Sequence, residues 1–359
     1  MLDNPKPDRM TPMERLDALM AGNPIDRIPF FPFALGFCAQ NVGYSLFKFY
    51  NEPEKCFWSQ VWTQEQYGYD GFPQYRYANF GAWEFGAEID FPRGEYDMAP
   101  KVIRFAVNSE QDVERLEVPD VKTAGAIPLY MQFSKLQERY GLPITVPCGS
   151  PVSRASNICG VDLFCRWVIR EPELVHRLAR LATDFILQVV QYWIDCFGTE
   201  RLVAADGTHM EANNLLSPKQ VEEFAFPYLN EVHEKVLAMG VKHFYTHFCG
   251  DQNLNLPLLS QIPMGNPGIA SISPEVDLTT AIKFLGENCV IAGNIEPQIL
   301  QTGTPQEVFA LCKEAILEAK HSAPRGYMLM AGCDVPIHAP PYNFYMMKKA
   351  INDFGWYDK

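Results

Sequence analysis

Residues 241–250 read VKHFYTHFCG, a short apolar run that ends in a histidine, a cysteine and a glycine. Similar short apolar runs occur at residues 142–149, 201–207, 268–273, 289–294 and 327–332. Continuous apolar runs of this length are typical of strands that are buried on both faces, as the strands of parallel sheets are. We therefore expect at least these six strands in one parallel sheet. The strand at 241–250 has polar residues, His247 and Cys249, at its C-terminal end.

The segments between these runs have helical character. The expected helices lie near residues 160–170, 172–197, 217–239, 276–286, 305–320 and 341–353. Ser217, followed by Pro218 and then Gln220, is a typical helix start. Strands that alternate with helices predict parallel βα units. Weaker strands near the N-terminus, such as residues 27–35, bring the total to about eight, which predicts a (β/α)8 TIM barrel. A doubly wound open sheet is the alternative, but no GxGxxG segment follows any of the strands.

The N-terminal third of the chain is less regular. Thr11 precedes Pro12 and Glu14, which is a capping-box pattern for a helix that ends near Gly22. Residues 37–120 are rich in aromatic residues and glycine, and residues 83–105 alternate as a β-hairpin does. We expect a single domain over residues 1–359, in which 37–120 is an insertion that covers one end of the barrel.

The composition narrows the class of protein. The chain has 359 residues, of which 47% are hydrophobic, so it can bury a large core. Its net charge of −13 argues against nucleic-acid binding, which needs a basic surface. No signal peptide and no membrane-spanning apolar segment stands out, so we expect a cytoplasmic protein with no membrane partner. The ten cysteines include no CxxC pair, which argues against a secreted disulfide scaffold.

Polar residues gather at the C-terminal ends of the expected strands. These residues are Asp206, His247, Cys249, Asn294, Glu296, Cys333 and Asp334. In a barrel such strand ends converge on one mouth, where active sites form. His247 and Cys249 are two apart on a strand, so they point to the same side. Together with Cys333 they would leave zinc one open position, as catalytic zinc sites do. The alternative is that they are ordinary buried core residues.

Asp206 and Glu296 are the candidate catalytic residues. Either carboxylate could complete the metal shell or orient a ligand, and Glu211 competes for that role. Glu296 has a second interpretation, because Pro297 could begin a helix that Glu296 caps. His209 is either a ligand, a hydrogen-bond donor to substrate or an ordinary loop histidine.

Five segments occur in an order that resembles the uroporphyrinogen decarboxylase superfamily over nearly the whole chain. They are MTPMERLDALMAGNPIDRIPF (10–30), NNLLSPKQVEEFAFPYLNEV (213–232), HFCGD (247–251), IAGNIEPQIL (291–300) and GYMLMAGCDVP (326–336). The resemblance independently implies a TIM barrel. The decarboxylases of this superfamily have an arginine-rich RQAGRY segment after the first strand, which holds substrate carboxylates. Here residues 34–45 read ALGFCAQNVGYS, without arginine, which speaks against tetrapyrrole decarboxylation.

The other branch of the superfamily comprises corrinoid-dependent methyltransferases. Their zinc motif H-x-C…C is matched by His247, Cys249 and Cys333. The resemblance therefore implies zinc, and methyl transfer between a corrinoid and a thiol acceptor or a methoxylated or methylated donor, in a direction that stays open. Because the sequence has no DxHxxG segment, we expect the cobalamin to come from a separate corrinoid protein. A homodimer stays open, and the alternatives are a decarboxylase of a small acid and a non-catalytic ligand-binding barrel.

Overall fold

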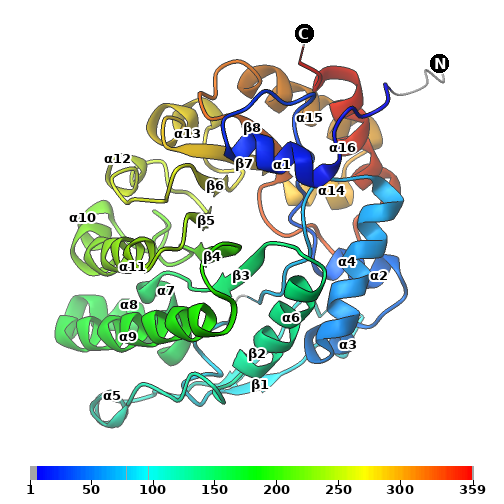
Figure 1. The fold of residues 1–359 in the computed structure, drawn as a ribbon. Helices are drawn as coiled ribbons and strands as arrows, with labels where there is room; N and C mark the ends of the chain where they lie inside the picture. The colour runs from blue at the N-terminus through cyan, green and yellow to red at the C-terminus, as the bar shows by residue number, and fades with distance from the viewer. Residues whose placement is uncertain (1–5, 78, 96, 358–359) are drawn as a thin grey trace.

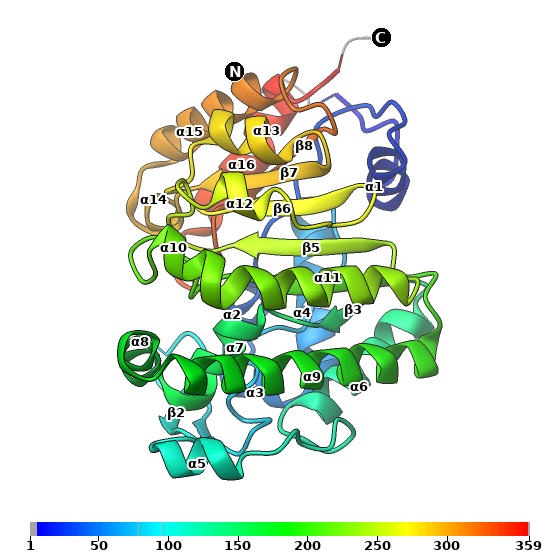
Figure 2. The same ribbon diagram turned by 90° about the vertical axis from the view of Figure 1, so that its left-hand side faces the viewer.

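The computed structural model describes residues 6–77, 79–95 and 97–357, and its centre is a parallel sheet. Six strands pair in chain order, each in parallel with the next. They are β3 (Ile144–Pro147), β4 (Leu202–Gly207), β5 (His243–Phe248), β6 (Gly268–Ile272), β7 (Cys289–Ile295) and β8 (Tyr327–Ala331). Figures 1 and 2 show the strands inside a layer of helices. The predicted α/β fold with successive parallel strands is confirmed.

The helices before, between and after these strands form the outer layer. They are α6 (Ile127–Arg139), α7 (Pro151–Cys159), α8 (Val161–Arg170), α9 (Pro172–Phe197), α10 (Pro218–Gln220), α11 (Phe226–Ala238), α12 (Leu256–Leu259), α13 (Leu278–Leu285), α14 (Pro297–Thr302), α15 (Pro305–Ala319) and α16 (Pro341–Phe354). A π-helical segment, Val221–Ala225, joins α10 to α11. Ser217 and Gln220 form the predicted capping box. Within the described ranges, no helix is both long and apolar enough to span a membrane.

The first predicted strand lies beyond β8. The N–H of Phe31 donates to the carbonyl of Leu329 at 3.0 Å, and the N–H of Leu329 donates to the carbonyl of Pro29 at 2.9 Å. The N–H of Asp70 in turn donates to the carbonyl of Phe30 at 2.6 Å. Residues 29–31 therefore continue the parallel order after β8, and the chain that begins at Asp70 lies next to them. Below, the barrel interior means the space inside β3–β8, residues 29–31 and residues 70–77.

Alternation along the strands decides which side chains face that interior. Val203, Tyr245, Ile269 and Met328 belong to one apolar cluster, separate from the larger cluster that packs against the helices. Since side chains alternate with a period of two, odd-numbered residues of β5 face inward, and His247 and Cys249 share the side of Tyr245.

Helix α1 (Pro12–Met20) covers the N-terminal end of the barrel. Thr11 and Glu14 make the predicted capping box. Leu16 and Leu19 join the cluster of the barrel interior, so the helix lies across the starts of the strands.

A buried ionic network ties α1 to the barrel. The Nε of Arg15 donates to Asp26 at 2.6 Å, and the Nη1 of Arg27 donates to Asp70 at 2.7 Å. Arg15 also pairs with Asp70, and both arginines and Asp70 are fully buried. Although burial raises it, the hydrogen bond from Arg15 lowers the pKa of Asp26 below its usual value. These charges are therefore mutually compensated inside the protein.

The predicted insertion is only partly an insertion. It contains α2 (Gly36–Asn41), α3 (Leu46–Asn51), α4 (Pro53–Tyr67), the strands β1 (Glu88–Asp90) and β2 (Lys101–Arg104), and α5 (Glu110–Arg115). β1 and β2 form the predicted antiparallel hairpin. Residues 70–77, however, line the barrel interior rather than covering an end, with Phe72, Gln74 and Arg76 on the inner side. Two of these three inward residues are polar, which hid the strand-like alternation from sequence inspection.

Candidate metal centre

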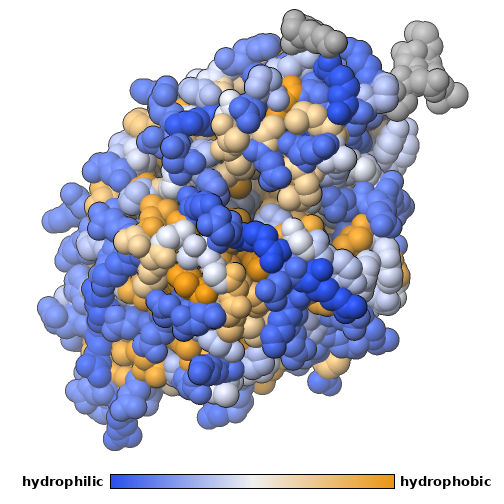
Figure 3. Space-filling model, viewed as in Figure 1, coloured by the Kyte–Doolittle hydropathy of each residue, from blue (hydrophilic) through white to orange (hydrophobic). Residues whose placement is uncertain are grey.

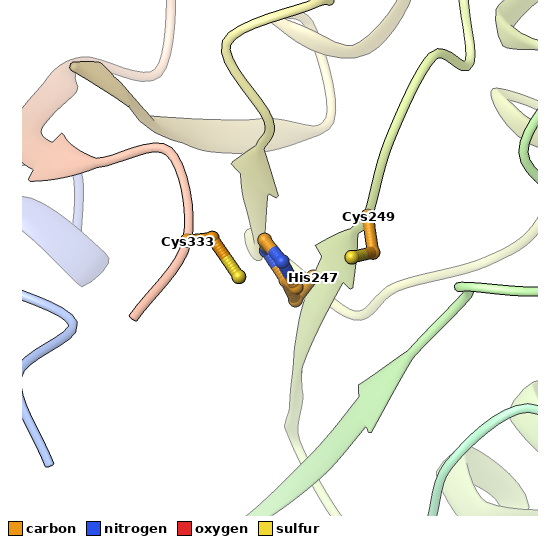
Figure 4. A group of neighbouring side chains, drawn as sticks. All are labelled: His247, Cys249 and Cys333. Atoms are coloured by element: carbon orange, nitrogen blue, oxygen red, sulfur yellow. The ribbon is translucent and has the colours of Figure 1, made fainter. Parts of the chain in front are cut away.

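Three side chains converge where β5 and β8 end. His247 lies in β5, Cys249 comes directly after the last residue of β5, and Cys333 lies in the loop after β8. Their ligand atoms all lie within 4.8 Å of one another, and Figure 4 shows the three side chains pointing toward one shared space. β6 and β7 separate the two strands in the sheet, so only the curvature of the barrel wall brings Cys333 to the other two. The convergence expected from the sequence is present, and metal binding stays a prediction.

His247 is held in the orientation that a metal ligand needs. Its side chain is buried, and its Nδ1 lies 2.9 Å from the Oγ of Ser271. Its Nε2 is buried and has no hydrogen-bond partner among the described residues. A ligating histidine commonly donates its other N–H to a fixed acceptor, which leaves the remaining nitrogen for the metal. The unpaired Nε2 beside two thiols fits a metal ion.

The two cysteines act as one acid–base pair. The hydrogen bond from Cys333 lowers the pKa of Cys249, and the hydrogen bond with Cys249, together with burial, raises the pKa of Cys333 to about 12. The two thiols are therefore coupled, and loss of the proton from one makes loss of the proton from the other harder. A bound cation would displace these protons, because cysteines ligate metals as thiolates. Both cysteines are only partly buried, so a ligand can reach them.

Ser271 and Ser273 support the site from β6 and the residues that follow it. They share one side of the strand, where Ser271 contacts His247 and Ser273 contacts Cys249. The Oγ of Ser273 also accepts the N–H of Gly250 at 2.9 Å. The sequence signal was two serines at alternate positions in GIASIS, and the prediction missed them because small polar residues are common in loops and strand ends.

Replacing Ser271 by alanine is expected to lower zinc affinity roughly 10- to 100-fold, because His247 loses the contact that fixes its ring. The affinity is measured by competition with a chromophoric chelator. Ser322→Ala, on the exposed surface, is the matched control and should equal the parent. Equal affinities in Ser271→Ala and the parent would show that the contact does not orient the ligand.

Asp206 lies at the C-terminal end of β4, as expected, but its side chain points away from the barrel interior. Its Oδ2 is 2.8 Å from the Nε2 of His233 in α11, and the Nδ1 of that histidine is 2.8 Å from the carbonyl of Pro263. The His233 ring stacks on Phe244, which belongs to the outer core. In β4 the odd-numbered residues, such as Val203, face the barrel interior. The even-numbered Asp206 therefore faces the helical layer. This placement gives no support to the predicted catalytic role.

Glu296 caps a helix. Its Oε1 accepts the N–H of Gln298 at 3.2 Å at the start of α14, with Pro297 at the first helical position. This contact is the one that the capping alternative requires. A direct role at the metal stays a prediction, and the cap alone accounts for a carboxylate at this position.

Glu296→Gln is expected to keep the parent's zinc content and to cost less than about 1 kcal/mol of stability, since the amide oxygen can still accept the N–H of Gln298. Zinc analysis and thermal unfolding of the purified variant provide the test. A loss of zinc at an unchanged melting temperature would instead place Glu296 in the metal shell.

The loop after β4 brings two further groups toward the mouth. Glu211 is fully buried and accepts hydrogen bonds from the hydroxyls of Ser150 and Ser153. Burial, followed by the positive charge of Arg154 and the neighbouring imidazole of His247, lowers the pKa of His209 to about 3. His209 is therefore a neutral imidazole in the neighbourhood of the triad, while Glu211 already has partners of its own.

Two other strand-end residues hold the backbone. Asp334 accepts the N–H of Leu35 at 2.9 Å, and burial raises the pKa of its carboxyl to about 8. The side-chain amide of Asn294 donates to the carbonyl of Val276 at 2.9 Å. Asp334 thereby links the loop that carries Cys333 to the segment after the first strand.

Comparison with known proteins agrees with this architecture. The family model described as uroporphyrinogen decarboxylase (URO-D) matches residues 11–354. The methylcobamide:CoM methyltransferase MtbA of Methanosarcina acetivorans is 26% identical over 267 residues, which are 73% of this chain and 74% of that protein. The uroporphyrinogen decarboxylase of Trichodesmium erythraeum is 28% identical over 187 residues, 52% of this chain and 49% of that protein. The solved structure of a methyltransferase from Methanosarcina mazei has the same fold, with a TM-score of 0.80 at 21% identity, covering 96% of this chain and 99% of that one.

Proposed function

The chain belongs to the uroporphyrinogen decarboxylase family, and from that premise we propose that it is a zinc-dependent methyltransferase of a corrinoid-dependent system. The observation that carries the proposal is the convergence of His247, Cys249 and Cys333, with ligand atoms within 4.8 Å. The similarity to MtbA spans 73% of the chain, and that to the uroporphyrinogen decarboxylase of Chlorobium phaeobacteroides spans 69%, so the extent of similarity does not separate the two branches. The triad therefore carries the preference for the methyltransferase branch.

The ligand set suits zinc with one open position. Two thiolates and one imidazole are typical zinc ligands, and three protein ligands are the number that catalytic sites use. When bound, zinc supplies a position at which a thiol is held as its thiolate, or at which a methylated donor atom is polarised. The charge of two thiolates offsets that of the ion, which keeps a bound thiolate electron-rich and favours a thiol acceptor.

The surrounding residues orient this centre. Ser271 fixes the His247 ring, and the ring of Phe33 packs against it in a T-shaped arrangement, with ring centroids 5.4 Å apart. His209, neutral beside the triad, offers a hydrogen bond to a substrate without adding charge. A separate corrinoid protein would present its cofactor at the side where Cys249 and Cys333 are partly exposed. The chain itself would thus supply the metal and the substrate position.

A decarboxylase of a small acid is the second candidate, and the residues after the first strand disfavour it. In place of an arginine-rich segment, residues 36–41 form α2. Phe37 of this helix is buried and stacks on Phe344 at 4.6 Å between ring centroids. A buried apolar helix at this place offers no cationic group to substrate carboxylates.

The test compares two activities of the purified enzyme. Methylcobalamin with a panel of small thiols, and cob(I)alamin with a panel of methoxylated aromatics and methylamines, are followed by the corrinoid spectrum. We expect methyl transfer in one of the two directions and no turnover of uroporphyrinogen. Conversion of uroporphyrinogen without any methyl transfer would contradict the proposal.

A further inference from the structure

A cavity of about 310 Å³ lies at the N-terminal end of the barrel, the end opposite the triad. It is bounded by α1 and by the starts of β3, β4 and β5. Its apolar walls include Leu16, Met20, Phe31, Phe72, Val203 and Met328. Figure 3 shows the face on which α1 lies, hollowed beside that helix. Barrel interiors of this type are ordinarily filled by side chains, so a space of this size needs a reason.

Two arginines line the cavity, Arg76 and the exposed Arg201. Arg76 belongs to the 70–77 segment and is partly exposed, toward the cavity that it lines. Its guanidinium carbon lies 4.3 Å from the ring centroid of Tyr245 and 5.7 Å from that of Phe33. Its Nε and Nη2 are buried and have no hydrogen-bond partner among the described residues. The aromatic rings hold the cation, but they do not satisfy its N–H groups.

Arg76 differs from the two arginines of the nearby ionic network in its partners. Arg15 and Arg27 are fully buried, and each is paired with carboxylates, including Asp70. The buried nitrogens of Arg76 have no such partners, which is costly unless a ligand supplies the anion. The opening of the cavity carries both signs of charge, with Asp17 and Glu200 beside Arg201. These charges neither favour nor exclude the entry of an anion. Selectivity for charge therefore falls on Arg76.

We infer that this cavity is a second ligand site, which takes a small hydrophobic molecule with one carboxylate or similar anionic group. The apolar walls match a hydrocarbon or aromatic tail, and the guanidinium of Arg76 matches a carboxylate. Its volume falls at the small end of ordinary ligand pockets, about 300–1,000 Å³. The apolar walls of this site lie at the other end of the strands from the proposed methyl-transfer centre, and the ring of Phe33 contacts both Arg76 and His247.

The test uses octanoate and 1-octanol, which share a tail and differ in charge, titrated calorimetrically into the purified full chain. Octanoate is expected to bind at least about tenfold more tightly than octanol, the difference that a charge-assisted hydrogen bond supplies. Arg76→Met should abolish this difference by weakening octanoate alone. Val203→Phe, which fills the cavity, should weaken both ligands.

Circular dichroism and thermal unfolding of each variant serve as the check that the barrel is intact. The variant that lacks Cys249 and Cys333 should bind octanoate as the parent does, which separates this site from the metal centre. The inference is overturned if the parent does not bind octanoate, if Arg76→Met binds it as tightly as the parent, or if the cysteine variant loses it. None of these measurements involves methyl transfer, so they do not depend on the proposed function.

Discussion

We expect the parent to bind about one zinc per chain, and the replacement of Cys249 and Cys333 together by alanine to abolish that binding. The double variant keeps only His247, and a single imidazole does not retain zinc against dilution. The fold should survive, because both cysteines are only partly buried and their loss leaves little cavity. Elemental analysis gives the zinc content, and circular dichroism with thermal unfolding reports the fold.

The matched control removes two cysteines elsewhere. Cys165 and Cys196 are outside the buried core, and their replacement by alanine should leave the zinc content at the parent's value. Retention of zinc by the Cys249/Cys333 variant would end the assignment of the triad. Loss of zinc in the control variant as well would show that the measurement reports general damage rather than a site.

Asp70→Asn is expected to destabilise the protein by about 3–5 kcal/mol, the range for breaking a buried ion pair from one side. Asp70 is fully buried, pairs with Arg15 and Arg27, and accepts the N–H of Phe30 at 2.8 Å. The amide keeps the shape but leaves two buried guanidinium groups short of a counter-charge. Urea unfolding followed by fluorescence measures the change in free energy of unfolding.

Glu200→Gln is the control for Asp70→Asn. Glu200 also pairs with a cation, the Nζ of Lys242 at 2.7 Å, but on the exposed surface. Its loss should cost no more than about 1 kcal/mol. If the two variants were equally stable, the network under α1 would contribute no more than an ordinary surface pair.

The strands and the convergence of the three candidate ligands could be predicted because their signals are local or repeat with a fixed period. His247 and Cys249 share a strand, and their spacing alone places them on one side. Cys333 was placed by the convergence of parallel strand ends, which is a property of the whole fold. The capping boxes at Thr11 and Ser217 depend on residues three apart, and both are present.

The residues that prediction missed depend on facts that no local pattern carries. A strand buried on both faces shows no polar alternation, so the sequence could not tell that Asp206 faces α11 and not the mouth. The inward Gln74 and Arg76 obscured the wall segment 70–77. The pairing of Arg15 with Asp70 joins residues 55 apart in the chain, and only the assembled fold brings them together.

The most direct test of the central claim measures methyl transfer as a function of zinc. The enzyme is stripped of metal with a chelator, and the rate at which the substrate found active in the two panels exchanges a methyl group with the corrinoid is followed spectrally. The account predicts that the rate falls with the zinc content and returns when about one equivalent of zinc per chain is restored. A zinc-free enzyme that transfers methyl groups as fast as the zinc-loaded one would contradict it.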